Sequence, residues 1–328
     1  MSMDEVAKKA GVSTATVSRV MNGSRSVKAS TRARVEAIIS QEGYTANRLA
    51  RNLRTAESRL LITMVPDFSN PFYAEIVKGI DAVARRHGYH LLLCDTGASL
   101  TEERTYFDML RTHLADGAIC LDPVSTQREL ASENSLLQWV ACCEFDPKGS
   151  VPYVGIDNAK AARDAVKYLV ERGRRRIAFI NSDERFLYAR QRKVGYMTAL
   201  SEAGLTPYDG AIVKTDGLTF DDGRRVAKRL LASAIKPDAI FAVSDTLAIG
   251  AMQAVHELGL RVPQDVAVIG FDNIPLATMV QPALTTIAQP MFRLGENAAN
   301  LLLERMRDPS TPALGTLLDH ELVIRNSA

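Results

Sequence analysis

The feature that most constrains the fold is an alternation of apolar runs and amphipathic stretches between residues 60 and 272. The apolar runs predict buried strands, at 60–66, 89–95, 116–122, 175–180, 211–216, 238–245 and 266–272. The stretches between them have helical spacing, near 71–87, 101–114, 189–203, 221–233 and 246–258. Strands that alternate with helices predict a parallel sheet covered on both faces.

The alternation starts twice, so we expect two doubly wound parallel-sheet subdomains of similar build. ARRHGYHLLL resembles VERGRRRIAF, and ADGAIC resembles PDAIFA. Ligands of such sheets bind at the carboxyl ends of the strands, and two facing subdomains form a cleft there. We expect the first half at about 60–157 plus 290–315, and the second at about 158–289 plus 316–328.

The N-terminal segment differs from this body in charge and pattern. Residues 1–60 hold 11 Lys and Arg against 5 Asp and Glu, whereas the remaining residues hold 29 against 33. A basic head on an acidic body is typical of a head that meets a polyanion. SMDE at residues 2–5 predicts a capping box, and Gly11 ends the helix that it begins. Ser13 begins a second helix that ends at Gly23, and a third is expected near 30–42.

Two short helices joined by a three-residue turn, braced by a third, predict a helix-turn-helix. The second helix carries short side chains at its start, so its backbone could approach DNA bases in the major groove. Thr14 and Ala15 suit contacts with base edges and thymine methyls, and Arg19 suits a bidentate contact with guanine. Phosphate contacts suit Ser13, Thr16, Ser18, Asn22 and Tyr44. The alternative is a plain pair of surface helices, which spacing alone leaves open.

Several function classes find no support in the sequence. The sequence contains no apolar run of about 18 residues, so it predicts no membrane span. The N-terminus lacks the pattern of a secretory signal. The cysteines, Cys94, Cys120, Cys142 and Cys143, lie in apolar runs and are expected to be buried reduced thiols of a cytoplasmic protein. Adjacent Cys142 and Cys143 leave a redox sensor as an alternative. The spacing of the five histidines predicts no metal site, and no catalytic motif is present. We therefore expect no metal, no cofactor and no enzyme activity.

The segments VAKKAGVSTATVSRVMNG and TRARVEAIISQEGYTANRLARNLR resemble the head of the lac repressor family of bacterial transcriptional regulators. The resemblance implies a DNA-binding head at 1–45, a hinge helix and linker at 46–59, and an effector-binding and dimerisation body at 60–328. In this family the hinge inserts a leucine into the minor groove, where it unstacks a base step and bends the duplex. Leu53 matches that leucine, and Arg51 matches the arginine of the hinge. A linker leucine that packs on the body is the alternative for Leu53.

The resemblance continues through the body in PDFSNPFYAEIVKGI, GYMTALSEAG and VPQDVAVIGFDNI, where the core is similar to periplasmic sugar-binding proteins. Within the family, the stretches VPDFSNPFYAEI, CCEF and PALTTIAQP look most like the cytidine-repressor branch. Matching positions imply an effector site made of Phe72, Tyr73, Asp122, Glu144, Tyr188, Arg192, Ser244 and Asp272.

These side chains suit a ligand with a ring and hydroxyl groups. An aromatic face packs on a ring, while Asp and Arg bind hydroxyls in opposite senses. Phe72 and Tyr73 could instead be core aromatics, and an Asp that follows a strand could cap a helix. For Asp157 we expect the cap.

The sequence thus predicts a homodimeric repressor in which a small-molecule effector changes the affinity for double-stranded operator DNA. A nucleoside is favoured as the effector and a sugar comes next. A sugar-binding protein without a regulatory role is the alternative function, and an enzyme that uses the cleft is a weaker one.

Overall fold

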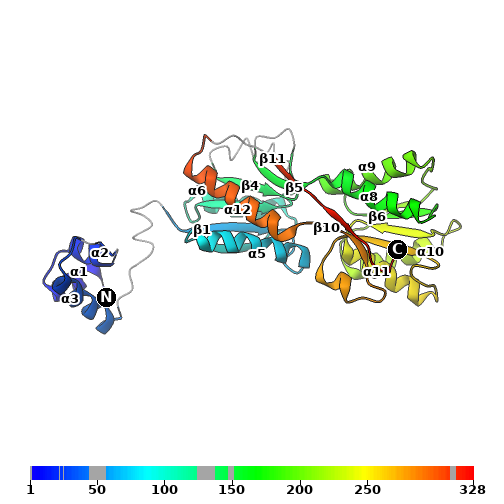
Figure 1. The fold of residues 1–328 in the computed structure, drawn as a ribbon. Coiled ribbons are helices and arrows are strands. Elements are labelled where there is room, and N and C mark those ends of the chain that lie inside the picture. Colours follow the sequence, from blue (N-terminus) through cyan, green and yellow to red (C-terminus); the bar gives the residue numbers. More distant parts are fainter. Residues whose placement is uncertain are drawn as a thin grey trace. The chain divides into compact units, whose positions relative to one another are not determined.

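The structure is a computed structural model that describes the whole chain except residues 1, 22, 25, 44–56, 124–136, 147–150 and 311–314. It divides into two compact units, Met1–Ser58 and Arg59–Ala328. Each unit has its own hydrophobic core. In Figure 1 the blue helices belong to the first unit, and the body from β1 onward is the second.

The first unit holds the three predicted helices, α1 (Met3–Ala10), α2 (Thr14–Met21) and α3 (Ala29–Gln41). The capping box of Ser2 and Glu5 is present, and Gly11 ends α1 in the left-handed conformation that favours glycine. Val6, Val17 and Val35 are fully buried, one from each helix. Arg32 of α3 donates hydrogen bonds to the carbonyl oxygens of Val20 and Ser24, so it fixes the end of α2 against α3.

The first sheet of the body has the strand order β11-β5-β4-β3-β1-β2, and all its strands are parallel. Its strands are β1 (Leu60–Val65), β2 (His90–Asp95), β3 (Gly117–Leu121), β4 (Trp139–Cys142), β5 (Tyr153–Ile156) and β11 (Gly315–Leu318). Its helices are α5 (Pro71–Arg86), α6 (Leu100–Arg111) and α12 (Met291–Arg307).

Alternate residues of a strand of this sheet point to opposite faces. Leu61 and Val65 of β1 belong to the large core beneath α5 and α12, whereas Ile62 and Met64 pack with Phe107 of α6. β1 is therefore buried on both sides, which explains why all its residues but Thr63 are apolar.

The second sheet has the order β12-β10-β9-β8-β6-β7. Its strands are β6 (Ile177–Asn181), β7 (Ile212–Lys214), β8 (Ala239–Ala242), β9 (Ala267–Asp272), β10 (Thr285–Ala288) and β12 (Glu321–Val323). Its helices form two pairs, α8 (Asn158–Glu171) with α9 (Leu187–Glu202), and α10 (Phe220–Leu231) with α11 (Asp245–Glu257), and a short 3-10 helix spans Pro275–Thr278. Unlike the other strands, β12 is antiparallel to its neighbour β10.

The chain passes between the two sheets three times (Figure 1). The passages lie between β5 and α8, between β10 and α12, and between β11 and β12. The third passage follows Leu318, later than the boundary near 315 expected from the sequence, because β11 pairs with β5 of the first sheet. Three connections between two sheets leave room for a hinge motion that opens or closes the space between them.

Glycines allow α5 to approach α12 closely, and likewise α10 to approach α11. A Cβ atom added at Gly79 of α5 would lie 2.1 Å from the carbonyl oxygen of Phe292 in α12, and one at Gly295 of α12 would lie 2.0 Å from that of Ile76. Gly223 and Gly250 make the same reciprocal contact between α10 and α11. Since any larger side chain would force these backbones apart, the layers that carry the pocket described below depend on small residues.

Candidate functional site

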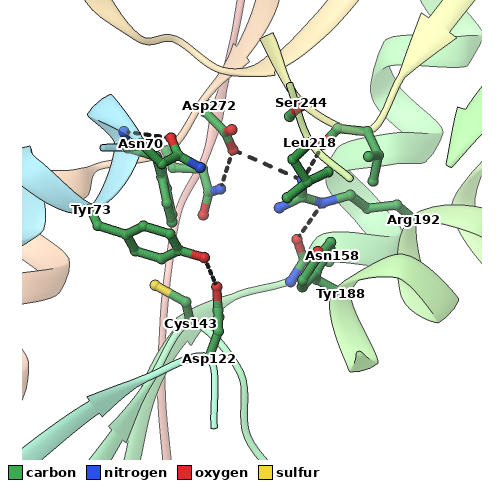
Figure 2. Close-up of a pocket in the computed structure, with 13 residues that line it drawn as sticks. Asn70, Tyr73, Asp122, Cys143, Asn158, Tyr188, Arg192, Leu218, Ser244 and Asp272 are labelled. Atoms are coloured by element: carbon green, nitrogen blue, oxygen red, sulfur yellow. Dashed lines mark hydrogen bonds and ion pairs between the residues drawn. The ribbon is translucent and has the colours of Figure 1, made fainter. Parts of the chain in front are cut away.

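Seven of the eight residues expected at the effector site line one cavity between the two sheets (Figure 2). They are Phe72, Tyr73, Asp122, Tyr188, Arg192, Ser244 and Asp272. The first three come from the first subdomain and the others from the second. All stand at the carboxyl ends of strands or the starts of helices, as a doubly wound sheet predicts.

Arg192 occupies the wall formed by the second subdomain. Its Nε donates to Asn158 Oδ1 at 2.9 Å, its Nη1 donates to the Val243 carbonyl oxygen at 2.5 Å, and Nη1 lies 3.9 Å from Asp272 Oδ1. The guanidinium carbon lies 3.5 Å from the ring centroid of Phe271. These contacts hold the guanidinium in one orientation toward the cavity, as Figure 2 shows.

Tyr73 and Asp122 form the opposite wall. The Tyr73 hydroxyl donates to Asp122 Oδ2 at 2.5 Å, and its ring packs edge-on against Phe72. Asp122 Oδ1 is buried and has no hydrogen-bond partner among the described residues. A buried carboxylate oxygen is costly without a partner, so this atom suits a donor group of a bound molecule.

Burial dominates the electrostatics of the cavity. It raises the pKa of Asp272 to about 7, although Arg192 and a hydrogen bond from Gln289 lower it. It raises the pKa of Asp122 to about 6 against the opposing effects of Tyr73 and Arg192. Burial also lowers the pKa of Arg192. Asp272 therefore changes its charge near neutral pH, where a ligand can decide between its two forms.

Glu144, the eighth expected residue, does not line this cavity. Its Oε2 accepts a hydrogen bond from the backbone N–H of Leu187 at 2.7 Å. Leu187 begins α9 of the second subdomain, and the N-cap of this helix, Phe186, supplies no capping bond from its side chain. Glu144 follows β4 of the first subdomain, so it caps α9 from across the cleft. Burial and the charge of Asp122 raise its pKa well above the usual value.

A larger cavity of about 400 Å³ continues from the inner one, which measures about 30 Å³. The two share Asn70, Tyr73, Asp122, Tyr188 and Leu218. At the outer cavity the rings of Phe186 and Tyr188 stack at 5.5 Å, and Arg185 lies over Phe186. The inner space holds no more than a few waters, whereas the outer one falls within the size range of small-molecule sites.

Four polar residues of the cavity were missed by the sequence reasoning, namely Asn70, Cys143, Asn158 and Gln289. Asn158 and Gln289 flank passages of the chain between the sheets, so the available signal was a polar residue where one subdomain ends and the next begins. Asp157 is the N-cap of α8, where its Oδ1 accepts from Lys160 N at 2.9 Å. The cap interpretation of Asp157 is thus confirmed.

Cys143 differs from the expectation of two buried thiols on one strand. Cys142 ends β4 and is fully buried, but Cys143 leaves the strand with φ 69° and its side chain is only partly buried at the cavity wall. The two sulfurs lie 3.7 Å apart. The hydrogen bond with Cys142 and burial raise the pKa of Cys143 well above the usual value, which argues against a reactive thiolate.

The outer face of α2 carries the residues expected at DNA. Ser13, Thr14, Ala15 and Arg19 are exposed, and Thr16 and Ser18 are partly buried. Ser13 Oγ accepts from Thr16 N at 3.2 Å and lies 3.0 Å from the Thr16 hydroxyl, so it also begins the helix. Asn22, Tyr44, Arg51 and Leu53 lie outside the described residues.

Comparison with known proteins identifies both parts of the chain. Residues 2–47 match the model of bacterial regulatory proteins of the lacI family, and residues 166–328 match that of a periplasmic binding protein-like domain. The HTH-type transcriptional repressor CytR of Escherichia coli strain K12 is 38% identical over 99% of this chain and 95% of its own length. The chain belongs to the lacI family of bacterial regulatory proteins.

Solved structures agree with this assignment. The lac repressor dimer bound to operator and the anti-inducer ONPF is 26% identical, with a TM-score of 0.89 over 100% of this chain and 98% of that one. The complex of the transcriptional regulator CelR with cellobiose is 30% identical, with a TM-score of 0.75 over 100% of both chains.

Membership of the lacI family makes this chain a DNA-binding transcriptional regulator and not an enzyme. The body is a ligand-binding module of the family, as the sequence predicted. Within the described part of the chain, no helix is long and apolar enough to cross a membrane, and no group of three acidic, His or Cys side chains is placed to hold a metal ion.

Proposed function

We propose that the protein is a cytoplasmic, homodimeric repressor whose affinity for a twofold-symmetric operator changes when a nucleoside-like effector binds between the two subdomains. The cavity lined by both subdomains is the observation that carries this proposal. A ligand held by both walls binds one degree of closure better than another, and such differential affinity is what shifts a conformational equilibrium.

The chemistry of the cavity favours a nucleoside over a simple sugar. Asp122, Asp272 and Arg192 surround the small inner space, where they suit the hydroxyl groups of a ribose whose ring lies in the outer cavity. Phe186 and Tyr188 at the outer cavity suit the flat face of a base. The resemblance of VPDFSNPFYAEI, CCEF and PALTTIAQP to the cytidine-repressor branch supports the same class, whereas the CelR–cellobiose complex makes a sugar the second candidate.

For the head we propose that α2 enters the major groove. Thr14, Ala15 and Arg19 would contact base edges, and Ser13, Thr16, Ser18, Asn22 and Tyr44 would contact phosphates. Arg51 and Leu53 would act in the minor groove. A twofold operator needs two heads, which is the reason to propose a homodimer.

The test of the ligand class is a thermal-shift screen with cytidine, uridine, adenosine, ribose and cellobiose. A ligand at 100 times its Kd stabilises the protein by about 2.7 kcal/mol, which raises Tm by roughly 5–10 °C for a domain of this size. We expect a nucleoside to give such a shift. A shift with ribose or cellobiose alone would replace the nucleoside by a sugar, and no shift with any compound would overturn both classes.

Arg192→Ala is expected to abolish that shift while operator binding persists, because the guanidinium faces the cavity. Arg190→Ala is the matched control, since Arg190 lies on the same helix but is exposed and donates to the carbonyl oxygens of Glu184 and Arg185. Retention of the full shift in Arg192→Ala would remove Arg192 from the proposed site.

A further inference from the structure

The turn that carries Asp272 has an unusual backbone. Asp272 has φ 113° and Asn273 has φ 61°, so two consecutive residues other than glycine adopt positive φ. Such conformations are unfavourable for residues with a side chain and persist only where neighbouring groups hold them. Asp272 lines the inner cavity, and the direction of its carboxylate depends on this turn.

The side chain of Arg325, close to the C-terminus, holds one side of the turn. Its Nη2 donates to Asn273 Oδ1 at 2.6 Å, and its Nη1 donates to the Leu284 carbonyl oxygen at 2.6 Å. Its backbone N–H donates to Thr285 Oγ1 at 2.9 Å. One planar guanidinium thus ties the turn after β9 to the residues at the start of β10.

The segment around Arg325 is itself firmly anchored. The strand before it, β12, pairs with β10. The fully buried Ser327 accepts from Thr285 N at 2.8 Å and donates to the Val268 carbonyl oxygen at 2.6 Å. Arg325 is therefore presented to the turn from a fixed position.

Asp245 holds the other side of the turn. Its Oδ2 accepts from Ile274 N at 2.8 Å and its Oδ1 accepts from the Thr286 hydroxyl at 2.5 Å. Asp245 thus fixes the backbone that follows Asn273, while Arg325 fixes the Asn273 side chain. Neither residue lines the inner cavity.

We infer that Arg325 is a positioning residue of the effector site, which keeps the Asp272–Asn273 turn in its left-handed conformation and thereby aims the Asp272 carboxylate at the ligand. The ligand class in this inference rests on the proposed function. The C-terminal segment then belongs to the binding site although it touches no ligand, as a supporting shell does elsewhere.

The test compares Arg325→Ala, Asn273→Gly and the double variant by calorimetric titration of the full chain with cytidine. We expect Arg325→Ala to weaken cytidine binding at least about tenfold. Glycine adopts positive φ without strain, so Asn273→Gly in the Arg325→Ala background is expected to restore most of that loss. If Arg325 only stabilised the fold, a glycine at position 273 would not restore the cytidine affinity.

Arg174→Ala is the matched control, because Arg174 is also partly buried and donates to a loop carbonyl oxygen, that of Pro263. Cytidine affinity is expected to stay unchanged in this variant. If Arg325→Ala binds as the wild type does, or if the double variant stays as weak as Arg325→Ala, the inference is overturned.

Amide hydrogen exchange of the ligand-free protein separates this inference from the proposed function. Exchange at Ile274 is expected to accelerate about tenfold or more in Arg325→Ala and to remain unchanged in Arg174→Ala, because loss of the guanidinium frees the turn. If the wild type binds none of cytidine, uridine and adenosine, the nucleoside proposal fails, and this exchange decides the inference alone. Unchanged exchange at Ile274 would overturn it.

Discussion

At the residue scale, the cavity places two carboxyl groups and one guanidinium where water is largely excluded. Asp122, Arg192 and Asp272 are each less than a tenth exposed. The charge of Arg192 opposes the burial of both negative charges, and hydrogen bonds from Tyr73 and Gln289 add to this effect. Arg192 Nη1 lies 3.9 Å from Asp272 Oδ1, and water screens this buried pair less than it screens an ion pair at the surface. The site is therefore sensitive to proton concentration in the physiological range.

We predict that nucleoside affinity falls as pH is lowered from 8 to 6. Ligand hydroxyls donate to carboxylates, so binding favours the ionised forms of Asp272 and Asp122, whose pKa values are raised to about 7 and about 6. Affinity is lost by up to about tenfold per pH unit below the pKa of a group that must ionise. Calorimetric titrations at the two pH values measure the change.

The control for this prediction is Asp272→Asn, which should show a weaker pH dependence. An affinity that stays constant or rises on acidification would contradict the predicted requirement for ionised carboxylates.

The stability of the ligand-free protein should depend on pH in the opposite direction. The pKa of each carboxyl in the folded protein is raised above its ordinary value of 3.8. The contribution of these two groups to the free energy of unfolding is therefore greatest below pH 4, and it is lost as the pH rises through 6 to 7.

At the element scale, α9 is the helix that joins the two walls. It carries Tyr188 and Arg192 on the side of the cavity, and its first N–H group is bound by Glu144 of the other subdomain. An acidic side chain at a helix N-terminus satisfies a free N–H group and interacts favourably with the helix dipole. Closure of the cleft and the position of α9 are thereby linked through one side chain.

We predict that Glu144→Ala lowers the free energy of unfolding by about 1–2 kcal/mol, because it leaves the start of α9 uncapped. Glu144→Gln should retain most of the stability, since its amide oxygen can still accept from Leu187 N without a buried charge. Urea unfolding of the three proteins gives the comparison.

Glu202→Ala is the matched control, because Glu202 also belongs to α9 but forms an exposed ion pair with Arg163. Its effect on stability should be small. Equal losses in Glu144→Ala and Glu202→Ala would show that Glu144 has no special role at the cleft.

The hinge segment at 46–59 is the second element whose role can be tested. Leu53→Ala is expected to weaken operator binding at least about tenfold, because alanine is too short to unstack a base step, while nucleoside affinity stays unchanged. Fluorescence anisotropy with a labelled operator measures the first quantity and calorimetry the second. Unchanged operator affinity would refute the minor-groove role of Leu53.

At the scale of the whole molecule, the sequence predicted the architecture because periodicity is a local signal. The runs at 60–66 and 266–272 became β1 and β9, and the stretch near 71–87 became α5. The antiparallel β12 and the pairing of β11 with β5 could not be predicted, since they depend on how the chain returns between two sheets. The resemblance to the lac repressor family found seven cavity residues, because positions that match the family lie next to strands that the sequence pattern also predicts.

Contacts between distant residues account for what the sequence did not reveal. Glu144 looked like a ligand-binding carboxylate because it follows a strand, yet its partner is the start of a helix 43 positions away. The role of Arg325 depends on Asn273, 52 positions earlier, and on a positive φ that no sequence pattern announced. Side-chain partners across the cleft are set by the packed fold, which local patterns do not encode.

Reciprocal titrations test most directly the proposed coupling between operator binding at the head and ligand binding in the body. We would first select operator duplexes from a randomised pool, then measure operator affinity with and without saturating cytidine, and cytidine affinity with and without operator. Linkage requires both affinities to change by the same factor; typical couplings are about 5- to 150-fold. We predict equal factors clearly different from one. If the protein binds cytidine but its operator affinity is the same with and without cytidine, the proposed coupling is wrong.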